Sequence, residues 1–279
     1  MKKQDANAIV SRWLRLPHEG DDKYSRGVVT FVTGSQQYPG AALLGIHAVL
    51  ATGIGMVRYS GPATVSERVL LRFPEVVCEP GHSDAIVVGS GIAGPLSAEE
   101  RAEDRARVID ALAEPGIHIV DAGALELVEP LSPSALLTPH QGELDALSRR
   151  LGLEPNQERK GQAQSVAATL GACVLAKGAH TVVVAPQGES WALPLASAWL
   201  ATAGTGDALA GILGALAASN AATLRAKPEL MGELAAAGAL LHARAAELAS
   251  ERAGGGAFRV TQLCDVLPEV VGAVLTEVE

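Results

Sequence analysis

Short, fully apolar runs rich in β-branched residues alternate with longer Ala- and Leu-rich segments, and this alternation limits the fold more than any other feature of the sequence. The expected strands cover 27–34, 85–89, 117–123, 135–140, 172–178 and 181–186. The expected helices cover 40–53, 96–114, 142–152, 158–171, 207–219 and 229–252. Because apolar strands that alternate with helices are typical of a parallel sheet covered on both faces, the sequence predicts an α/β fold with a mostly parallel central sheet.

Composition and charge narrow the class of protein. A chain of 279 residues, of which 48% are hydrophobic and 19% charged, can bury a large core, and we expect a polar arm over 1–26 followed by one domain over 27–279. The net charge of -9, with no dense run of Lys or Arg, argues against a nucleic-acid or anionic membrane surface. The chain also has no signal-peptide core and no apolar stretch long enough for a membrane span. Three widely separated cysteines favour a reducing cytoplasm over a disulfide framework or a zinc site.

Polar, glycine-containing turns follow several of the expected strands. These turns are TGSQQYPGA (33–41), GSGIAGP (89–95), TPHQGE (138–143) and KGAHT (177–181), and AGTGD (203–207) precedes a late helix. Ligands of open α/β sheets bind outside the carboxyl ends of the strands, and the N-terminus of a helix attracts phosphate. The turns therefore predict one phosphate-binding site at this edge of the sheet.

Asp207 stands at the start of the Ala-rich helix, directly after Gly204, Thr205 and Gly206. A carboxylate repels phosphate, but it can take a proton from a hydroxyl group that attacks phosphate. The alternative is an ordinary N-cap, since Asp is favoured there.

Each of the other turns also has a plain structural interpretation. GSGIAG is compatible with an ordinary structural turn, and TPHQGE with a Pro-His turn followed by a capping glutamate. Lys177 is compatible with a surface lysine at a strand end. The occurrence of all these turns at successive strand ends favours a single functional site.

Four segments together resemble the signatures of the ADP-dependent NAD(P)H-hydrate dehydratases, a family with a ribokinase-like α/β fold. They are YPGAALLG (38–45), LTPHQGEL (137–144), KGAHTVV (177–183) and GTGDALAGILGAL (204–216), and the resemblance extends over about residues 27–270. Gly-x-Gly-Asp alone would indicate only a ribokinase-like kinase. In combination with the Thr-Pro-His-x-Gly-Glu and Lys-Gly-x-x-Thr signatures, the pattern is specific.

The resemblance implies a lyase that repairs damaged nicotinamide cofactor. Such an enzyme is expected to use ADP and Mg2+ to dehydrate the S epimer of NADH hydrate or NADPH hydrate, restoring NADH or NADPH and releasing AMP and phosphate. Phosphorylation of the ring hydroxyl makes chemical sense, because phosphate is a far better leaving group than hydroxide.

The resemblance also implies roles for individual residues. Asp207 would be the base, and Glu143 would give support through Mg2+ or its waters. The residues expected against the hydrate are Ala41, Gly91, His140 and Asp207. The residues expected against the nucleotide (ADP or AMP) are Lys177, Gly178, Ala179, His180, Thr181 and Gly206.

The chain departs from the family pattern at three places. It has GSGIA (89–93) for Gly-Pro-Gly-Leu-Gly, DAGALE (121–126) for Asp-Ala-Asp-Ala-Leu-Asn, and ASAWLATAG (196–204) without the usual Asn-Pro-Gly-Asn run. These changes concern the polar contacts around the substrate more than the reaction.

The resemblance further implies a cytoplasmic homotetramer and a separate epimerase for the other hydrate epimer. The apolar circumference expected for 229–252 agrees with burial on more than one side. Two alternative functions stay open. One is an ATP-dependent ribokinase-like kinase of a sugar or vitamin alcohol, and the other is a nucleotide sensor without turnover.

Overall fold

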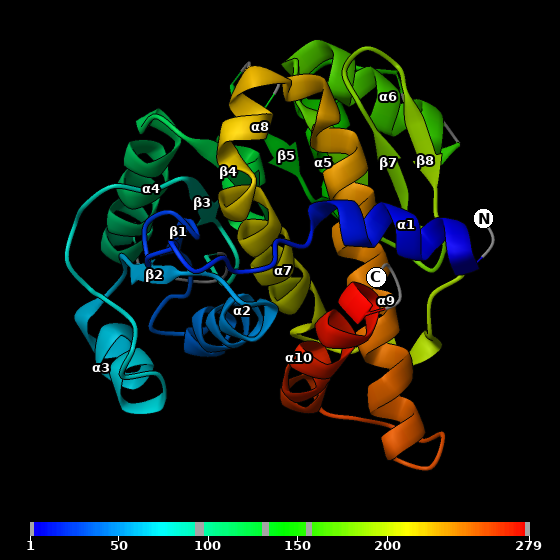
Figure 1. Cartoon of the computed structure of the whole chain (residues 1–279). Helices are drawn as coiled ribbons and strands as arrows, with labels where there is room; N and C mark the ends of the chain where they lie inside the picture. The colour runs from blue at the N-terminus through cyan, green and yellow to red at the C-terminus, as the bar shows by residue number, and fades with distance from the viewer. Residues whose placement is uncertain (1–2, 93–97, 130–133, 155–157, 277–279) are drawn as a thin grey trace.

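An eight-stranded sheet in the order β2-β1-β3-β4-β5-β6-β7-β8 forms the centre of the computed structural model, which describes residues 3–92, 98–129, 134–154 and 158–276 (Figure 1). Every pairing from β2 to β6 is parallel, whereas β7 and β8 are antiparallel. The strands are β1 (Val28–Val32), β2 (Met56–Tyr59), β3 (Ala85–Val88), β4 (Ile117–Val120), β5 (Leu136–Leu137), β6 (Cys173–Ala176), β7 (Val182–Val184) and β8 (Ser190–Ala192). The predicted mostly parallel sheet is confirmed.

Helices cover both faces of the sheet, as the apolar strands predict. They are α1 (Lys3–Trp13), α2 (Pro39–Thr52), α3 (Ala63–Arg72), α4 (Ala98–Ala113), α5 (Gln141–Arg150), α6 (Arg159–Leu170), α7 (Thr205–Ser219), α8 (Ala221–Ala226), α9 (Met231–Arg252) and α10 (Val260–Thr276). One buried cluster joins a sheet face to α2, α7, α9 and α10, and a second joins the other face to α4, α5 and α6. None of the helices in the described part of the chain is both long and apolar enough to span a bilayer.

The sequence analysis does not predict β2, β8 or α3. The four residues of β2 include Arg58, which interrupts the apolar run. β8 has three residues at the open edge of the sheet, and none of them is fully buried. The residues that α3 buries, Val65 and Val69, are four positions apart, a helical spacing that was present in the sequence.

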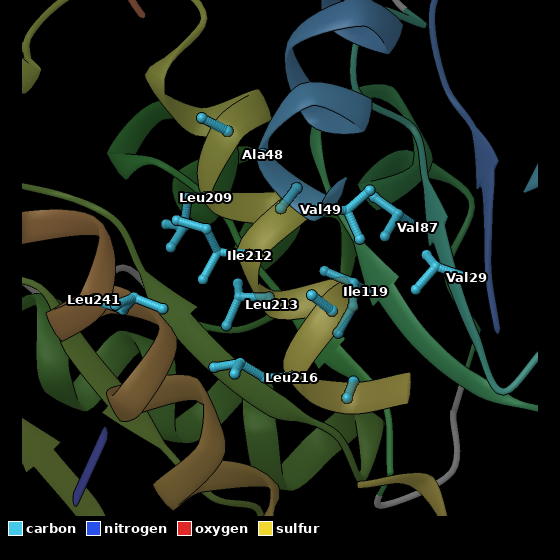
Figure 2. Packing of buried hydrophobic residues seen from close by; sticks show 14 of the residues in the cluster. Val29, Ala48, Val49, Val87, Ile119, Leu209, Ile212, Leu213, Leu216 and Leu241 are labelled. Atoms are coloured by element: carbon cyan, nitrogen blue, oxygen red, sulfur yellow. The ribbon is translucent and has the colours of Figure 1, made fainter. Parts of the chain in front are cut away.

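The small side chains of α7 allow this helix to pack directly against α2 (Figure 2). A Cβ atom on Gly211 would collide with the carbonyl oxygen of Gly45, and one on Gly45 would lie 3.4 Å from the carbonyl oxygen of Asp207. Larger residues at these contacts would separate the two helices. The Ala- and Gly-rich sequence therefore brings the first turn of α7 close to α2.

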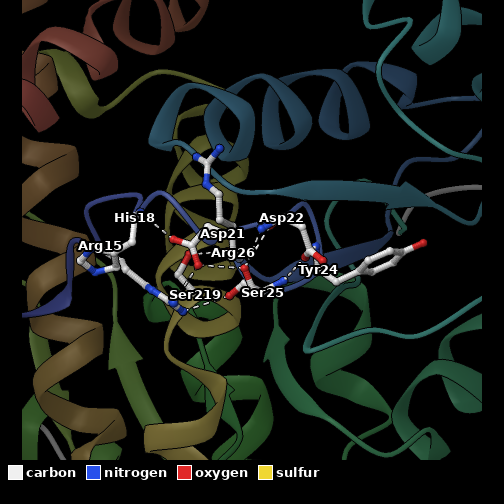
Figure 3. Close-up of polar contacts among 8 residues, drawn as sticks. All are labelled: Arg15, His18, Asp21, Asp22, Tyr24, Ser25, Arg26 and Ser219. Atoms are coloured by element: carbon white, nitrogen blue, oxygen red, sulfur yellow. Dashed lines mark hydrogen bonds and ion pairs between the residues drawn. The ribbon is translucent and has the colours of Figure 1, made fainter.

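The N-terminal segment packs on the domain through α1. Val10 and Trp13 are buried, and the Trp13 indole N–H donates a hydrogen bond to Glu233 of α9 at 3.2 Å. The carboxylate of Asp21 stabilises the turn after α1, because it accepts hydrogen bonds from the backbone N–H of His18 and from the Ser25 hydroxyl (Figure 3). The division between an arm over 1–26 and a domain from residue 27 stays a prediction.

Candidate active site

Residues that follow four parallel strands meet in a buried polar cluster around Asp121. Asp121 follows β4, is 3% exposed, and accepts hydrogen bonds from Ser90 Oγ after β3 and Thr138 Oγ1 after β5, both at 2.8 Å. Lys177 follows β6, and its Nζ donates to Asp121 Oδ1 at 2.6 Å. Burial by itself would raise the pKa of Asp121, but the Lys177 ammonium and the three hydrogen bonds lower it below its ordinary value. The cluster therefore holds a fully partnered, ionised carboxylate.

Lys177 links this cluster to the beginning of α7. Its Nζ lies 3.8 Å from Glu143 Oε2, and a Cβ atom on Gly206 would lie 3.5 Å from the same Nζ. Burial opposes the charged form, but the carboxylates of Asp121 and Glu143 raise the pKa of Lys177 above its ordinary value. A permanently charged ammonium thus lies beside the N-terminus of a helix, where both favour an anion.

Asp207 lies in the first turn of α7, but it is not the N-cap. That position belongs to Gly204, whose φ of 96° lies in the left-handed region that favours glycine. Burial, together with the charge of Asp121, raises the pKa of Asp207 to about 7, although Lys177 acts in the opposite direction. Asp207 can therefore gain or lose a proton near neutral pH, as a general base requires.

The loop after β3 contacts the first turn of α2, where Gly91 lies against Ala41. Gly91 has a φ of 70°, and a Cβ atom added to it would lie 2.9 Å from the carbonyl oxygen of Tyr38. Ser90 and Gly91 belong to the GSGIAGP turn, of which residues 93–95 lie outside the described part of the chain. Ser90, which stands where the family pattern has Pro, donates a hydrogen bond to Asp121. The backbone at Gly91 is therefore held close to both the first turn of α2 and the polar cluster.

His140 and Glu143 form a capping box at the start of α5, so the capping glutamate predicted for TPHQGE is confirmed. The backbone N–H of Glu143 donates to His140 Nδ1 at 3.2 Å, and the backbone N–H of His140 donates to Glu143 Oε2 at 2.7 Å. The His140 side chain is 60% exposed. The box holds Glu143 near Lys177 and leaves the His140 ring at the surface.

The predicted nucleotide residues 178–181 form a turn after β6. Gly178, Ala179 and His180 are exposed, and Thr181 Oγ1 donates to the carbonyl oxygen of Gly178 at 3.0 Å. Thr181 also borders a cavity of about 300 Å³. Its other lining residues include Leu193, Pro194, Ala196, Ala239, Leu240 and Arg244. The turn therefore connects Lys177 to a largely apolar hollow large enough for a nucleobase.

The side chains that could bind a metal ion near this cluster are carboxylates. Within 3–92, 98–129, 134–154 and 158–276, no group of three or more His, Cys, Asp or Glu side chains is arranged to hold a metal ion. Glu143 is 21% exposed in its side chain, so its carboxylate is accessible to an ion at the site. Mg2+ is commonly bound by one or two carboxylates together with substrate phosphates, and this donor set fits such an ion.

Sequence reasoning missed Ser90, Asp121 and Thr138 as site residues. Each of them comes within two positions of the end of a strand, at the edge where ligands of open sheets bind. That position was the signal that could have identified them. Their hydrogen bonds to one another, however, depend on the order of the strands in the sheet.

Comparisons with known proteins agree with this arrangement. The family model of NAD(P)H-hydrate dehydratase matches residues 29–269. The bifunctional NAD(P)H-hydrate repair enzyme Nnr of Mycobacterium tuberculosis is 38% identical over 222 residues, covering 77% of this chain and 46% of the relative. The chain thus spans about half the length of the curated relatives of this kind that it matches. The ADP-dependent (S)-NAD(P)H-hydrate dehydratase of Xanthomonas campestris is 32% identical over 236 residues, covering 76% of this chain and 79% of the relative.

Solved structures give the same assignment. The ADP/ATP-dependent NAD(P)H-hydrate dehydratase of Bacillus subtilis, co-crystallised with ATP and Mg2+, matches 96% of this chain and 97% of its own with a TM-score of 0.79 and 26% identity. The neighbours also include a ribokinase-like superfamily protein, so the predicted ribokinase-like fold is confirmed. The chain belongs to the NAD(P)H-hydrate dehydratase family.

Proposed function

We propose that this chain is an ADP-dependent lyase that dehydrates the S epimer of NADH hydrate or NADPH hydrate, returning NADH or NADPH and releasing AMP and phosphate. One observation carries the proposal: Asp207, with a pKa of about 7, shares the N-terminus of α7 with the Lys177 ammonium. A proton acceptor beside a site for phosphate is what phosphorylation of a hydroxyl group requires. The names of the relatives support the choice of ADP and of the hydrate.

The proposed reaction has two steps. The ring hydroxyl oxygen bonds to the β-phosphorus of ADP as the bond from this phosphorus to the bridging oxygen breaks, so AMP leaves and Asp207 accepts the hydroxyl proton. The carbon–oxygen bond to the new phosphate group then breaks, with electrons supplied by the ring nitrogen. Loss of a proton from the neighbouring ring carbon restores the double bond of the reduced nicotinamide.

We assign the nucleotide to Lys177, Gly206 and the turn 178–181. The Lys177 ammonium and the backbone N–H groups of the first turn of α7 offer positive potential to phosphate oxygens. The cavity beside Thr181 offers apolar walls for the base. This places the transferring phosphate between the turn 178–181 and Asp207.

We assign the hydrate to the opposite side of Asp207. Ala41, in the first turn of α2, has a small side chain, and Gly91, in the loop after β3, has none. His140 projects an exposed ring from the N-terminus of α5, and because its Nδ1 accepts the Glu143 backbone N–H, its Nε2 can donate a hydrogen bond. In this assignment, these three residues face the ring of the hydrate.

Mg2+ at this site would be held by Glu143 and the nucleotide phosphates. It would neutralise phosphate charge during the transfer. The remaining proposals concern the whole protein: a cytoplasmic location, a homotetramer, and an epimerase as pathway partner. The apolar surface of α9 does not by itself support a tetramer, because α1, α7, α10 and the strands β6 to β8 pack against this helix within the chain.

The proposal is tested with freshly prepared NADH hydrate, ADP and Mg2+, following the absorbance of the reduced nicotinamide. We expect an ADP-dependent gain in absorbance with release of AMP and phosphate. If this gain is missing while a sugar or vitamin alcohol is phosphorylated by ATP, the protein is a kinase instead. Calorimetric binding of ADP without any phosphate release would identify the sensor.

A further inference from the structure

The ion pair between Asp121 and Lys177 is not used by the reaction as proposed above. It joins the ends of β4 and β6 across the shorter strand β5, and its two residues are 56 positions apart in the chain. A buried ion pair by itself is weak support for stability, because desolvation offsets much of the attraction. Its place next to the start of α7 therefore calls for a functional explanation.

The hydrogen bonds of Asp121 occupy both carboxylate oxygens. Thr138 and Lys177 donate to Oδ1, and Ser90 donates to Oδ2. These contacts orient the carboxylate and leave it poorly available as a metal ligand or as a base. Asp121 therefore acts on the site through its neighbours.

Two charged groups determine the electrostatic environment of Asp207. The negative charge of Asp121 and burial raise the pKa of Asp207, whereas the charge of Lys177 lowers it. Lys177 itself is faced by Asp121, Glu143 and Asp207. From α9, the buried His242 faces the backbone of Thr205 in the same turn, but burial lowers the pKa of His242 to about 4, so it adds no charge at neutral pH.

We propose that Asp121 is a positioning residue for phosphoryl transfer, which holds the Lys177 ammonium at the N-terminus of α7 and keeps a fixed negative charge beside Asp207. The first effect places a cation where phosphate oxygens gather. The second keeps the Asp207 carboxylate basic enough to accept a proton. This inference rests on the proposed function for its chemistry, but its electrostatic content concerns the free protein.

The test is Asp121→Asn, with the Asp207 carboxyl carbon followed by NMR titration and assigned by comparison with Asp207→Asn. We expect a midpoint near 7 in the parent protein. In Asp121→Asn we expect the midpoint to fall by about one pH unit or more, because the like charge is lost and Lys177 becomes free to pair with Asp207. The acid limb of kcat/KM should move in the same direction, and the KM for ADP should rise several-fold. A midpoint that stays within about 0.3 pH units of the parent overturns the proposal.

Thr138→Val is the matched control, because it removes one hydrogen bond to Asp121 and leaves the charge in place. Its Asp207 midpoint should stay close to that of the parent, and a shift as large as that of Asp121→Asn would show a merely structural effect. If Asp121→Asn does not fold, the proposal is tested on the parent protein alone, through the Asp207 midpoint and the exchange of the Lys177 ammonium. A parent midpoint near 4, or a Lys177 ammonium that exchanges as fast as a free lysine, overturns the proposal.

These titrations need neither hydrate nor ADP. If the parent protein shows no hydrate turnover but the midpoints shift as expected, the proposed function fails and the role of Asp121 toward Asp207 stands. If turnover is present and the midpoints do not move, the proposed function stands and the role of Asp121 toward Asp207 fails.

Discussion

Gly91, in the loop after β3, lies against Ala41 in the first turn of α2, so that a Cβ atom added to Gly91 would lie 2.5 Å from the Cβ of Ala41. Gly91 also has a φ of 70°, which a residue with a side chain rarely adopts. An alanine at this position would push the loop after β3 away from α2 at the proposed hydrate site.

Gly91→Ala should therefore lower hydrate turnover at least tenfold, mainly through a higher KM for the hydrate, with ADP binding nearly unchanged. Steady-state kinetics and calorimetry with ADP measure the two effects. Gly40→Ala is the matched control in the neighbouring first turn of α2, because a Cβ atom there would have no atom within 4 Å. Equal kinetic effects of the two variants would contradict the assignment of Gly91.

Asp207→Asn should reduce turnover by about 10²- to 10⁴-fold while the fold is kept, since it removes proton acceptance at nearly constant size. The lower half of that range is expected, because phosphoryl transfer needs little help from a base until late in the reaction. Turnover within a few-fold of the parent would exclude Asp207 as the base. Loss of the folded state would show a structural role.

Activity should depend on pH through the same residue. A base with a pKa of about 7 is largely protonated below this pH, so kcat/KM should fall tenfold per pH unit well below it and level off above about pH 8. The measurement is kcat/KM for the hydrate at saturating ADP between pH 5 and 9. A flat profile down to pH 5 would contradict a base with this pKa.

The free energy of unfolding, in contrast to the activity, should fall as pH rises and Asp207 ionises. The folded protein binds the Asp207 proton more tightly than the unfolded chain, whose Asp pKa is near 3.8, so ionisation between this pH and about 7 lowers the free energy of unfolding. Asp207→Asn removes this loss and should gain stability relative to the parent as pH rises, by about 1 kcal/mol or more at pH 8. Urea unfolding at pH 5 and pH 8 measures the gain, with the exposed Asp110→Asn as control.

Lys177→Ala should weaken ADP binding by about one to two orders of magnitude, because it removes a charge-assisted contact worth roughly 1.5 to 3 kcal/mol. Hydrate binding should change little. The variant should also unfold more easily, because the buried Asp121 carboxylate loses its 2.6 Å partner. Calorimetry with ADP and thermal unfolding measure the two effects, and unchanged ADP affinity would remove Lys177 from the nucleotide site.

The sequence by itself determined the α/β class and the edge of the sheet where the site lies. Apolar runs such as Ala85–Val88 and Ile117–Val120 need cover on both faces, and the turns after them carry Ser90 and Asp121. The capping box of His140 and Glu143 was also within reach, because its two residues are three positions apart and interact locally. The short edge strand β8 could not be predicted from the sequence, since it forms by pairing with β7 and its three residues show no clear strand pattern.

Only the tertiary structure decided which polar residues act on one another. Asp121 and Lys177 meet because β4, β5 and β6 lie side by side, and no local pattern shows that order. The pKa of Asp207 follows from this meeting, since it depends on burial and on charges contributed by β4 and β6. Local propensities are read along the chain, whereas burial and Coulomb interactions act through space between residues that the sequence separates.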